Sequence, residues 1–297
     1  MKPRELDLRL RSLGEIRDIL SAMKNMARME VHRLERFLAT QRRVVTAIES
    51  AARDLRAFHP ELFAGEQDER CREVYVVLGS ERGFCGNFNE SLLRVLAARA
   101  QPGPGAAIVA VGGNLRNKIG DDTFLPVFLP GAGVVEEVED TMVRLMDALS
   151  GEGIAKPHRS SALRVTVIHH TPAGGEIGLS LLSPSFGGGD KPPQYAYEPM
   201  LNLDPVSFAA GLLEQYLFAR LHELVYGSLM AENEARVAHM QAAVERLDRK
   251  LPDLRRRRNV LRQEEITEEI EVIMLSADLL EPGTGYADAG TYNEVAP

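Results

Sequence analysis

The sequence predicts a mixed α/β fold in which a small, Rossmann-like α/β module is inserted between two long terminal helices. Near both ends of the chain, apolar residues recur in alternating steps of three and four, the spacing of a coiled coil. Because a compact module is inserted between the two helices, we expect them to meet as an antiparallel pair. In the middle, short β-rich runs alternate with helical segments. We therefore expect an N-terminal coiled-coil helix over 1–58, an inserted module over 59–205, a C-terminal coiled-coil helix over 206–280 and a polar flexible tail over 281–297.

The N-terminal helix is predicted by an apolar stripe that runs from Leu13 to Leu55, in which only Gln41 is polar. No proline follows Pro3 within this segment, so a helix of ~50 residues would extend ~75 Å and would need a partner helix along most of its length. Residues 1–58 carry 13 basic and 8 acidic side chains, a net charge of +5. This charge is either a solvated helix face or a surface that faces acidic partner loops.

The module is predicted by β-rich runs and helical segments that alternate along the chain. The runs lie at 73–78, 106–111 and 163–169, with a possible fourth at 177–182, and the helical segments lie at 89–100 and 134–149. Strands that alternate with helices indicate a small parallel sheet with helices on its faces. Residues 183–205 are rich in glycine and proline, and we expect a loop that returns to the C-terminal helix.

The C-terminal helix is predicted from Val206 to Leu280, where the apolar spacing continues and its phase slips twice. Pro252 should kink this helix or end a segment of it. Four consecutive arginines follow at 255–258 and cover all faces of a helix, so they cannot all lie in a buried seam. A solvated collar is favoured over nucleic-acid binding for this run, because the cluster is short and the chain is acidic.

Composition excludes several classes of protein. The net charge of −8 excludes a generally basic protein that coats nucleic acid, and 44% hydrophobic with 26% charged residues is typical of soluble globular chains. Two cysteines, Cys71 and Cys85, form no disulfide framework and favour a reducing compartment. The first residues lack the apolar segment of a signal peptide, and no window approaches about 18 consecutive apolar residues. A role at a membrane would require another component to hold the chain there.

A glycine-rich loop at 79–87 follows the first predicted strand, where phosphate-binding loops lie in α/β folds. It matches neither GxxxxGK[ST] nor GxGxxG, so we expect its glycines to serve a tight turn and a close backbone approach. Cys85 could be a nucleophile beside His169 and His170, but a structural role is favoured for all three. No metal-ligand spacing or nucleophile elbow is present, so we predict no catalytic residues, no cofactor and no metal.

Four segments carry a more specific signal. The N-terminal helix has Ala-Met at 22–23, the glycine loop has Glu-Arg-Gly-Phe-Cys-Gly at 81–86, and the C-terminal helix has Ala-Glu-Asn-Glu-Ala-Arg at 231–236 and Arg-Gln-Glu-Glu-Ile-Thr at 262–267. In this order they resemble motifs of the gamma subunit of the rotary F-type ATP synthase, and the resemblance covers nearly the whole chain.

The resemblance implies a non-catalytic rotor shaft that couples ion flow through a membrane ring to ATP synthesis or hydrolysis in partner subunits. The implied partners are the alpha and beta subunits of the catalytic ring, the epsilon subunit and the c-subunit ring, and no nucleic acid. The implied location is peripheral, at the cytoplasmic face of a bacterial membrane. The resemblance places Arg82 and Cys85 near an acidic segment of a beta subunit, and Arg262 and Gln263 at a beta-subunit loop. The full set of implied partner-interface residues is Met23, Arg82, Cys85, Glu232, Arg236, Arg262, Gln263 and Thr267.

The chain departs from the family pattern in three places. Lysines that the family carries before its Ala-Met are missing from Arg17–Ser21, Pro252 and the arginine run are unusual, and the tail extends past the usual helix end. These differences suggest a divergent branch, such as the alternative or sodium-translocating type; the coupling ion is chosen in the membrane ring and cannot be predicted from the shaft. The residues alone also allow an independent nucleotide-binding α/β enzyme with coiled-coil dimerisation arms, or a scaffold protein.

Overall fold

The computed structural model describes residues 3–63, 72–99, 107–119, 127–150, 163–182, 197–198 and 200–278. Two helices are far longer than the rest, α1 (Pro3–Phe58) and α6 (Pro205–Asp278). The elements between them are η1 (Pro60–Phe63), β1 (Arg72–Leu78), α2 (Phe88–Arg99), β2 (Ala107–Val111), α3 (Gly113–Arg116), β3 (Val127–Leu129), η2 (Val135–Glu137), α4 (Val138–Ser150), β4 (Leu163–His170) and β5 (Ile177–Leu182). The expectations for Cys71, for most of the loop at 183–205 and for the tail at 281–297 lie outside the described residues.

Contacts divide the chain into two compact units, residues 1–18 with 245–297, and residues 19–244. In the first unit the start of α1 runs antiparallel to the end of α6: Arg17 donates to Asp248 at 2.6 Å, and Arg258 pairs with Asp7 at 3.3 Å. The sequence leaves open whether Pro252 kinks α6 or ends a segment of it. The helix in fact continues through Pro252, because one missing N–H removes a single bond from a 74-residue ladder.

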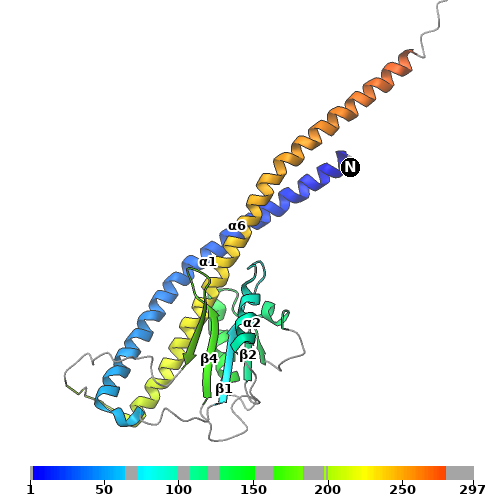
Figure 1. Cartoon of the computed structure of the whole chain (residues 1–297). Helices are drawn as coiled ribbons and strands as arrows, with labels where there is room; N and C mark the ends of the chain where they lie inside the picture. Colours follow the sequence, from blue (N-terminus) through cyan, green and yellow to red (C-terminus); the bar gives the residue numbers. More distant parts are fainter. Residues whose placement is uncertain are drawn as a thin grey trace, which may run out of the picture. The chain divides into compact units, whose positions relative to one another are not determined.

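In the second unit α1 and α6 again lie side by side and antiparallel (Figure 1). The Gln41 side-chain amide donates to the Ala219 carbonyl at 2.9 Å, and Lys24 donates to Gln241 at 2.8 Å. Gln41, the one polar residue of the apolar stripe, is therefore satisfied by a backbone acceptor on the partner helix. Near the end of α1, Val45 and Ala52 pack with residues of α6 in a small apolar cluster.

The sheet has five strands in the order β3-β2-β1-β4-β5. The first four are parallel, with Val76 of β1 opposite Val109 of β2 and Val167 of β4, and β5 pairs antiparallel with β4. The three predicted strands and the possible fourth are all present. β3 was not anticipated, because its three residues lie between Pro126 and Pro130 and are too few to show a period.

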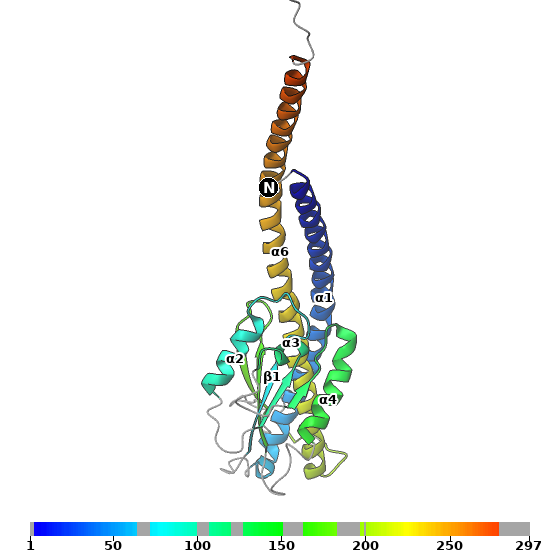
Figure 2. The same ribbon diagram turned by 90° about the vertical axis from the view of Figure 1, so that its right-hand side faces the viewer.

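The sheet is covered on both faces, which makes the described part of this unit a three-layer α/β structure (Figure 2). On one face, Val74 and Val76 of β1 belong to a core that includes α4, Leu34 of α1 and Leu221 of α6. On the other face, alternate strand residues pack against α2 and α3, with Leu92 of α2 fully buried. The middle of α1 therefore packs against both α6 and the module.

Candidate functional site

The glycine loop at 79–87 joins β1 to α2 at the carboxyl edge of the parallel strands. A Cβ on Gly79 would lie 2.6 Å from the Cβ of Leu115, and Gly112, which has φ 120°, lies against the Ser80 carbonyl. Gly79 therefore allows the close approach predicted for the loop glycines, and Gly112, which was not part of that prediction, allows another. Ser80 is fully buried and exchanges hydrogen bonds with Asn89 of α2 at 2.9 and 2.8 Å.

At this edge of the sheet, a carboxylate of the chain itself accepts hydrogen bonds from the loop amides. Glu81 Oε2 accepts hydrogen bonds from the backbone N–H groups of Gly113, after β2, and Gly131, after β3, each at 2.7 Å. In nucleotide-binding α/β folds, amides at the carboxyl ends of the strands receive the phosphate groups of the ligand. Glu81 takes these two donors, so this place offers no support for the alternative of a nucleotide-binding enzyme.

Glu232 of α6 reaches the same loop from the helix side. Its carboxylate accepts hydrogen bonds from the backbone N–H groups of Glu81 and Arg82, each at 3.2 Å, and forms an ion pair with Arg236 one helical turn later. Only 2% of Glu232 and 5% of Arg236 is exposed. Burial raises the pKa of the Glu232 carboxyl, and the Arg236 guanidinium and the two amides act in the opposite direction.

Arg236 uses its planar guanidinium to bind three acceptors at once. Besides Glu232, it donates to the Gly83 carbonyl at 3.1 Å and to Asn233 Oδ1 at 2.6 Å. Arginine has donors in a fixed fork that suits such an arrangement, whereas lysine has a single ammonium group. Glu232 and Arg236, both predicted as partner-interface residues, thus make buried contacts within this chain.

Cys85 lies in the apolar core beneath the loop and is 5% exposed. Its Sγ donates to Ser80 Oγ at 3.4 Å, and burial raises the pKa of the thiol. The two candidate histidines bond elsewhere: His169 lies 3.0 Å from Ser180 Oγ, and His170 lies 2.8 Å from the Gly175 carbonyl. A buried, protonated thiol without a histidine partner in the described structure is suited to packing and not to nucleophilic attack.

Beside this loop lies a hollow of about 250 Å³ that sequence reasoning identified only in part. Met23, Arg82 and Arg236, all predicted as interface residues, lie on its wall. Phe84 and Met26, which were not predicted, also line it and are 55% and 68% exposed. Phe84 has φ 64°, which is a strained conformation for a bulky residue, so the loop geometry itself presents this ring to solvent.

The remaining predicted residues, Arg262, Gln263 and Thr267, lie on α6 in the other compact unit. All three are exposed, and Thr267 Oγ1 donates to the Gln263 carbonyl at 2.9 Å. Seven large apolar side chains of this part of α6 are also exposed, at 46–65%. They are Val260, Ile266, Ile270, Val272, Ile273, Met274 and Leu275.

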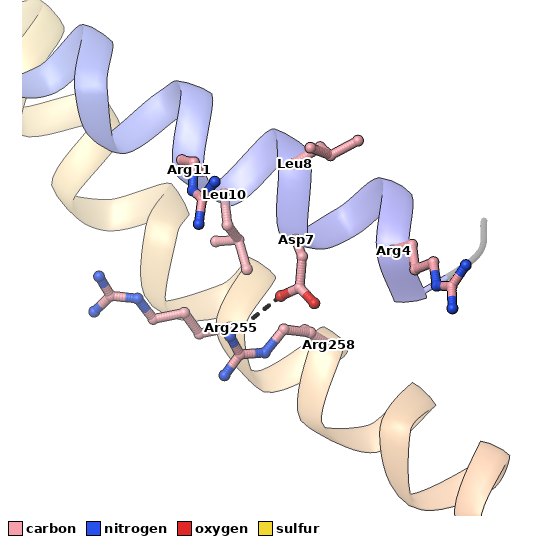
Figure 3. Close-up of a pocket in the computed structure, with 7 residues that line it drawn as sticks. All are labelled: Arg4, Asp7, Leu8, Leu10, Arg11, Arg255 and Arg258. Carbon is pink, nitrogen blue, oxygen red and sulfur yellow. Dashed lines mark hydrogen bonds and ion pairs between the residues drawn. The ribbon is translucent and has the colours of Figure 1, made fainter.

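An open hollow of about 730 Å³ in the same unit is lined by four arginines (Figure 3). Arg4 and Arg11 come from α1, and Arg255 and Arg258 come from α6. Asp7 is the one acidic residue on the wall and pairs with Arg258, so three guanidiniums exceed the local negative charge. Two arginines of the run at 255–258 therefore lie beside two arginines of α1 around the same hollow.

The described residues contain no group of three or more histidine, cysteine or acidic side chains placed to hold a metal ion. In the same part of the chain, no helix combines the length and the apolar character needed to cross a membrane.

The fold and these contacts define a class of protein with two long antiparallel helices and an α/β module held to them by buried carboxylates. The sequence pattern of the ATP synthase family matches residues 2–280. The ATP synthase gamma chain of Staphylococcus aureus strain JH9 is 24% identical over 294 residues, which cover 94% of this chain and 99% of the relative. The gamma chain of strain Newman matches to the same extent.

Solved structures share the fold. A chain of the Euglena gracilis mitochondrial ATP synthase (OSCP/F1/c-ring) has a TM-score of 0.58 at 16% identity, with 97% of this chain and 99% of that chain covered. A chain of the Tetrahymena thermophila mitochondrial ATP synthase (central stalk/c-ring) has a TM-score of 0.56 at 15% identity, with 76% and 99% covered. The chain therefore belongs to the ATP synthase family.

Proposed function

We propose that this chain is the gamma-type central rotor shaft of an ATP synthase and couples ion flow through a membrane ring to ATP synthesis or hydrolysis in partner subunits. The observation that carries the proposal is the family match over 2–280 on a chain whose two longest helices flank an α/β module. The chain contributes no catalytic site, and ATP is bound and converted by the alpha and beta subunits. Epsilon and the c-subunit ring are its further partners.

The architecture proposed for this role has four parts. Helices over 1–58 and 206–280 form an antiparallel coiled coil, the module over 59–205 lies between them in sequence, and a polar tail follows over 281–297. Hydrogen bonds and ion pairs between α1 and α6 in both compact units support the antiparallel pairing. A paired shaft resists twisting better than one helix, and this stiffness is what torque transmission needs. The complex holds the chain at the cytoplasmic face of a bacterial membrane.

Two exposed surfaces of the shaft face the catalytic ring in this proposal. One is the hollow around Arg82 and Phe84, where an apolar ring lies beside cationic groups and suits a partner loop of mixed acidic and apolar character. The other is the last part of α6, where Arg262 and Gln263 are free to bind a loop of a beta subunit. The arginine hollow is a third surface, and it favours acidic ring loops by charge complementarity.

Purification from native membranes tests the proposal. A tagged copy of the chain is expected to retrieve the alpha and beta subunits, with ATPase activity that disappears when these are removed. A chain that purifies alone and itself hydrolyses nucleotide would contradict the rotor function and favour an independent enzyme.

A further inference from the structure

We infer that Glu232, Arg236 and Glu81 form a rigid joint, which fixes the α/β module to the helix pair so that torque passes between them without slip. The inference rests on the proposed rotor function and concerns how the rotor holds together under load. It assigns a positioning role to Glu232 and Arg236, for which the family resemblance implied partner contacts, and to Glu81, for which no role was predicted.

The joint begins on one face of α6. Ser228, Glu232 and Arg236 follow each other at four-residue steps and therefore lie on the same side of the helix. Ser228 Oγ donates to the Leu78 carbonyl at 3.2 Å, at the end of β1. Glu232 and Arg236 bind the backbone of residues 81–83, in the loop that follows β1. Three turns of the helix thus bind the end of the central strand and the start of its loop.

Glu81 extends the joint to the neighbouring strands. Its backbone N–H is held by Glu232, and its own carboxylate holds the amides of Gly113 and Gly131, beyond β2 and β3. One continuous chain of hydrogen bonds therefore runs from α6 through the loop after β1 to the ends of two more strands.

The second helix is connected in the same way. Glu30 of α1 is 8% exposed and accepts a hydrogen bond from the Val135 amide at 2.7 Å, at the start of η2. Both long helices therefore bind backbone groups of the module through buried carboxylates near the same edge of the sheet.

The hydrogen bonds of the joint oppose a kind of motion that the apolar core does not oppose well. Apolar burial between the sheet and the helices is non-directional, so it opposes separation more than it opposes sliding. Hydrogen bonds to charged groups are directional, and a shift along or around α6 would break several at once. A buried ion pair can often be exchanged for apolar residues without loss of stability, so positional precision is a better account of Glu232 and Arg236 than stability alone.

The test uses the whole complex reconstituted into vesicles, with variant chains in place of the natural one. The measured quantity is the ratio of ions pumped to ATP hydrolysed while a gradient builds up. Glu232→Gln leaves a side chain of the same size but weakens its bonds to the two amides and to Arg236. We expect the ratio to fall by about a factor of three or more, on the scale of losing a net hydrogen bond.

Two further variants separate the joint from folding and from charge. Leu92→Ala opens the core under α2 without touching the joint, and we expect it to lower stability while leaving the ratio unchanged. Arg236→Lys keeps the positive charge, but all its donors lie on one nitrogen, so it cannot reach acceptors that Arg236 binds from three separate nitrogens. We expect it to lower the ratio as Glu232→Gln does. If Glu232→Gln does not assemble, Glu81→Gln is tested with the ion pair intact, with the same expected fall.

The inference is overturned if the Glu232→Gln, Glu81→Gln or Arg236→Lys complex keeps the natural ratio, or if Leu92→Ala lowers the ratio equally. A natural chain that fails to assemble with the catalytic ring would instead contradict the proposed function, so the two failures are distinguishable.

Discussion

At the scale of single residues, Cys85 shows how burial decides between roles that a motif leaves open. Its thiol is enclosed by core residues and donates to Ser80, while its neighbour Phe84 is exposed. A partner that binds this loop in the described conformation therefore meets the phenyl ring and Arg82 before it meets sulfur. The motif located the loop correctly, but it gave no information on which side chain points outward.

Replacing Cys85 with serine tests this assignment. Cys85→Ser puts a more polar hydroxyl into an apolar site, so we expect the free energy of unfolding to fall by about 1–3 kcal/mol. ATPase activity of the assembled complex should stay within a few-fold of the natural value, since no chemical step uses the thiol. Urea unfolding of the chain and ATPase assays of the complex measure the two effects. A loss of activity on the scale of about 100-fold would indicate catalysis instead.

The buried histidine His169 predicts a pH dependence of stability. Burial lowers the pKa of His169, which lies between the His170 carbonyl and Ser180 Oγ, so the folded state favours the neutral ring. The unfolded chain takes up a proton as the pH falls through about 6.5. Unfolding is therefore linked to proton uptake, and the stability contributed by neutral His169 is present above that pH and is lost below it.

Urea unfolding at about pH 7.5 and about pH 5.5 measures this effect. We expect the natural chain to lose stability towards the lower pH and His169→Gln to lose less. His32→Gln, at a position on α1 where the imidazole is largely exposed, serves as the control and should follow the natural chain. An identical fall in all three proteins would show that His169 does not contribute.

The same scale shows what sequence reasoning could not supply. The glycine loop was predicted because strand, glycine and helix signals are local. The role of Glu81 was not, because its carboxylate binds amides of Gly113 and Gly131 that come close only when three parallel strands align. No local pattern distinguishes such a glutamate from a solvated one.

At the scale of elements, the long helices and the strands of five or more residues were predictable from their sequence patterns, whereas the three-residue strand β3 was not. Fifty or more residues with apolar side chains at coiled-coil spacing predict a long helix, and α1 extends over Pro3–Phe58. β3 has three residues and depends entirely on the edge of β2 for its hydrogen bonds. Its position is thus set by tertiary structure and not by its own sequence.

The residues of the apolar stripe of α1 are also buried to different extents, although their spacing is regular. Leu34 is fully buried between α6 and the module, whereas Ile16 is 44% exposed. We expect Leu34→Ala to lower the free energy of unfolding by about 2–5 kcal/mol, the range for buried leucines. Ile16→Ala should cost less than about 1 kcal/mol, because much of its side chain already contacts water. Urea unfolding of both variants measures the difference, and equal losses would contradict the burial pattern.

At the scale of the whole molecule, the net charge of −8 conceals a strongly uneven distribution. Four arginines line one hollow formed by α1 and α6, and residues 264–271 directly beyond it on α6 contain five glutamates. A shaft that turns inside a ring of fixed subunits requires such asymmetry, because a uniform surface would bind every orientation equally. Arg262 lies between the basic and the acidic segment and is exposed.

We expect Arg262 to act through one partner contact and not through general charge. Its guanidinium can bind a carboxylate or carbonyl group of a beta-subunit loop with two parallel hydrogen bonds. Arg262→Ala should therefore weaken the coupling of ATP hydrolysis to ion pumping while the chain still folds and assembles. About 1.5–3 kcal/mol of hydrogen bonding to a charged group is at stake, enough to slow turnover severalfold without unfolding a helix of this length.

The matched control must remove an arginine of the same helix that has no structural partner across the pair. Arg258 is unsuitable because it pairs with Asp7 of α1, so its loss would also loosen the helices. Arg256 is 82% exposed at its side chain and contacts only Asp253 of its own helix among the described ion pairs, so Arg256→Ala changes the net charge equally without this cost. Paired assays of ATPase and ion pumping on both reconstituted complexes decide the question. Equal effects would mean that the arginines act through their total charge and that Arg262 makes no special contact. A loss of coupling confined to Arg262→Ala would identify Arg262 as a contact point between the shaft and the catalytic ring.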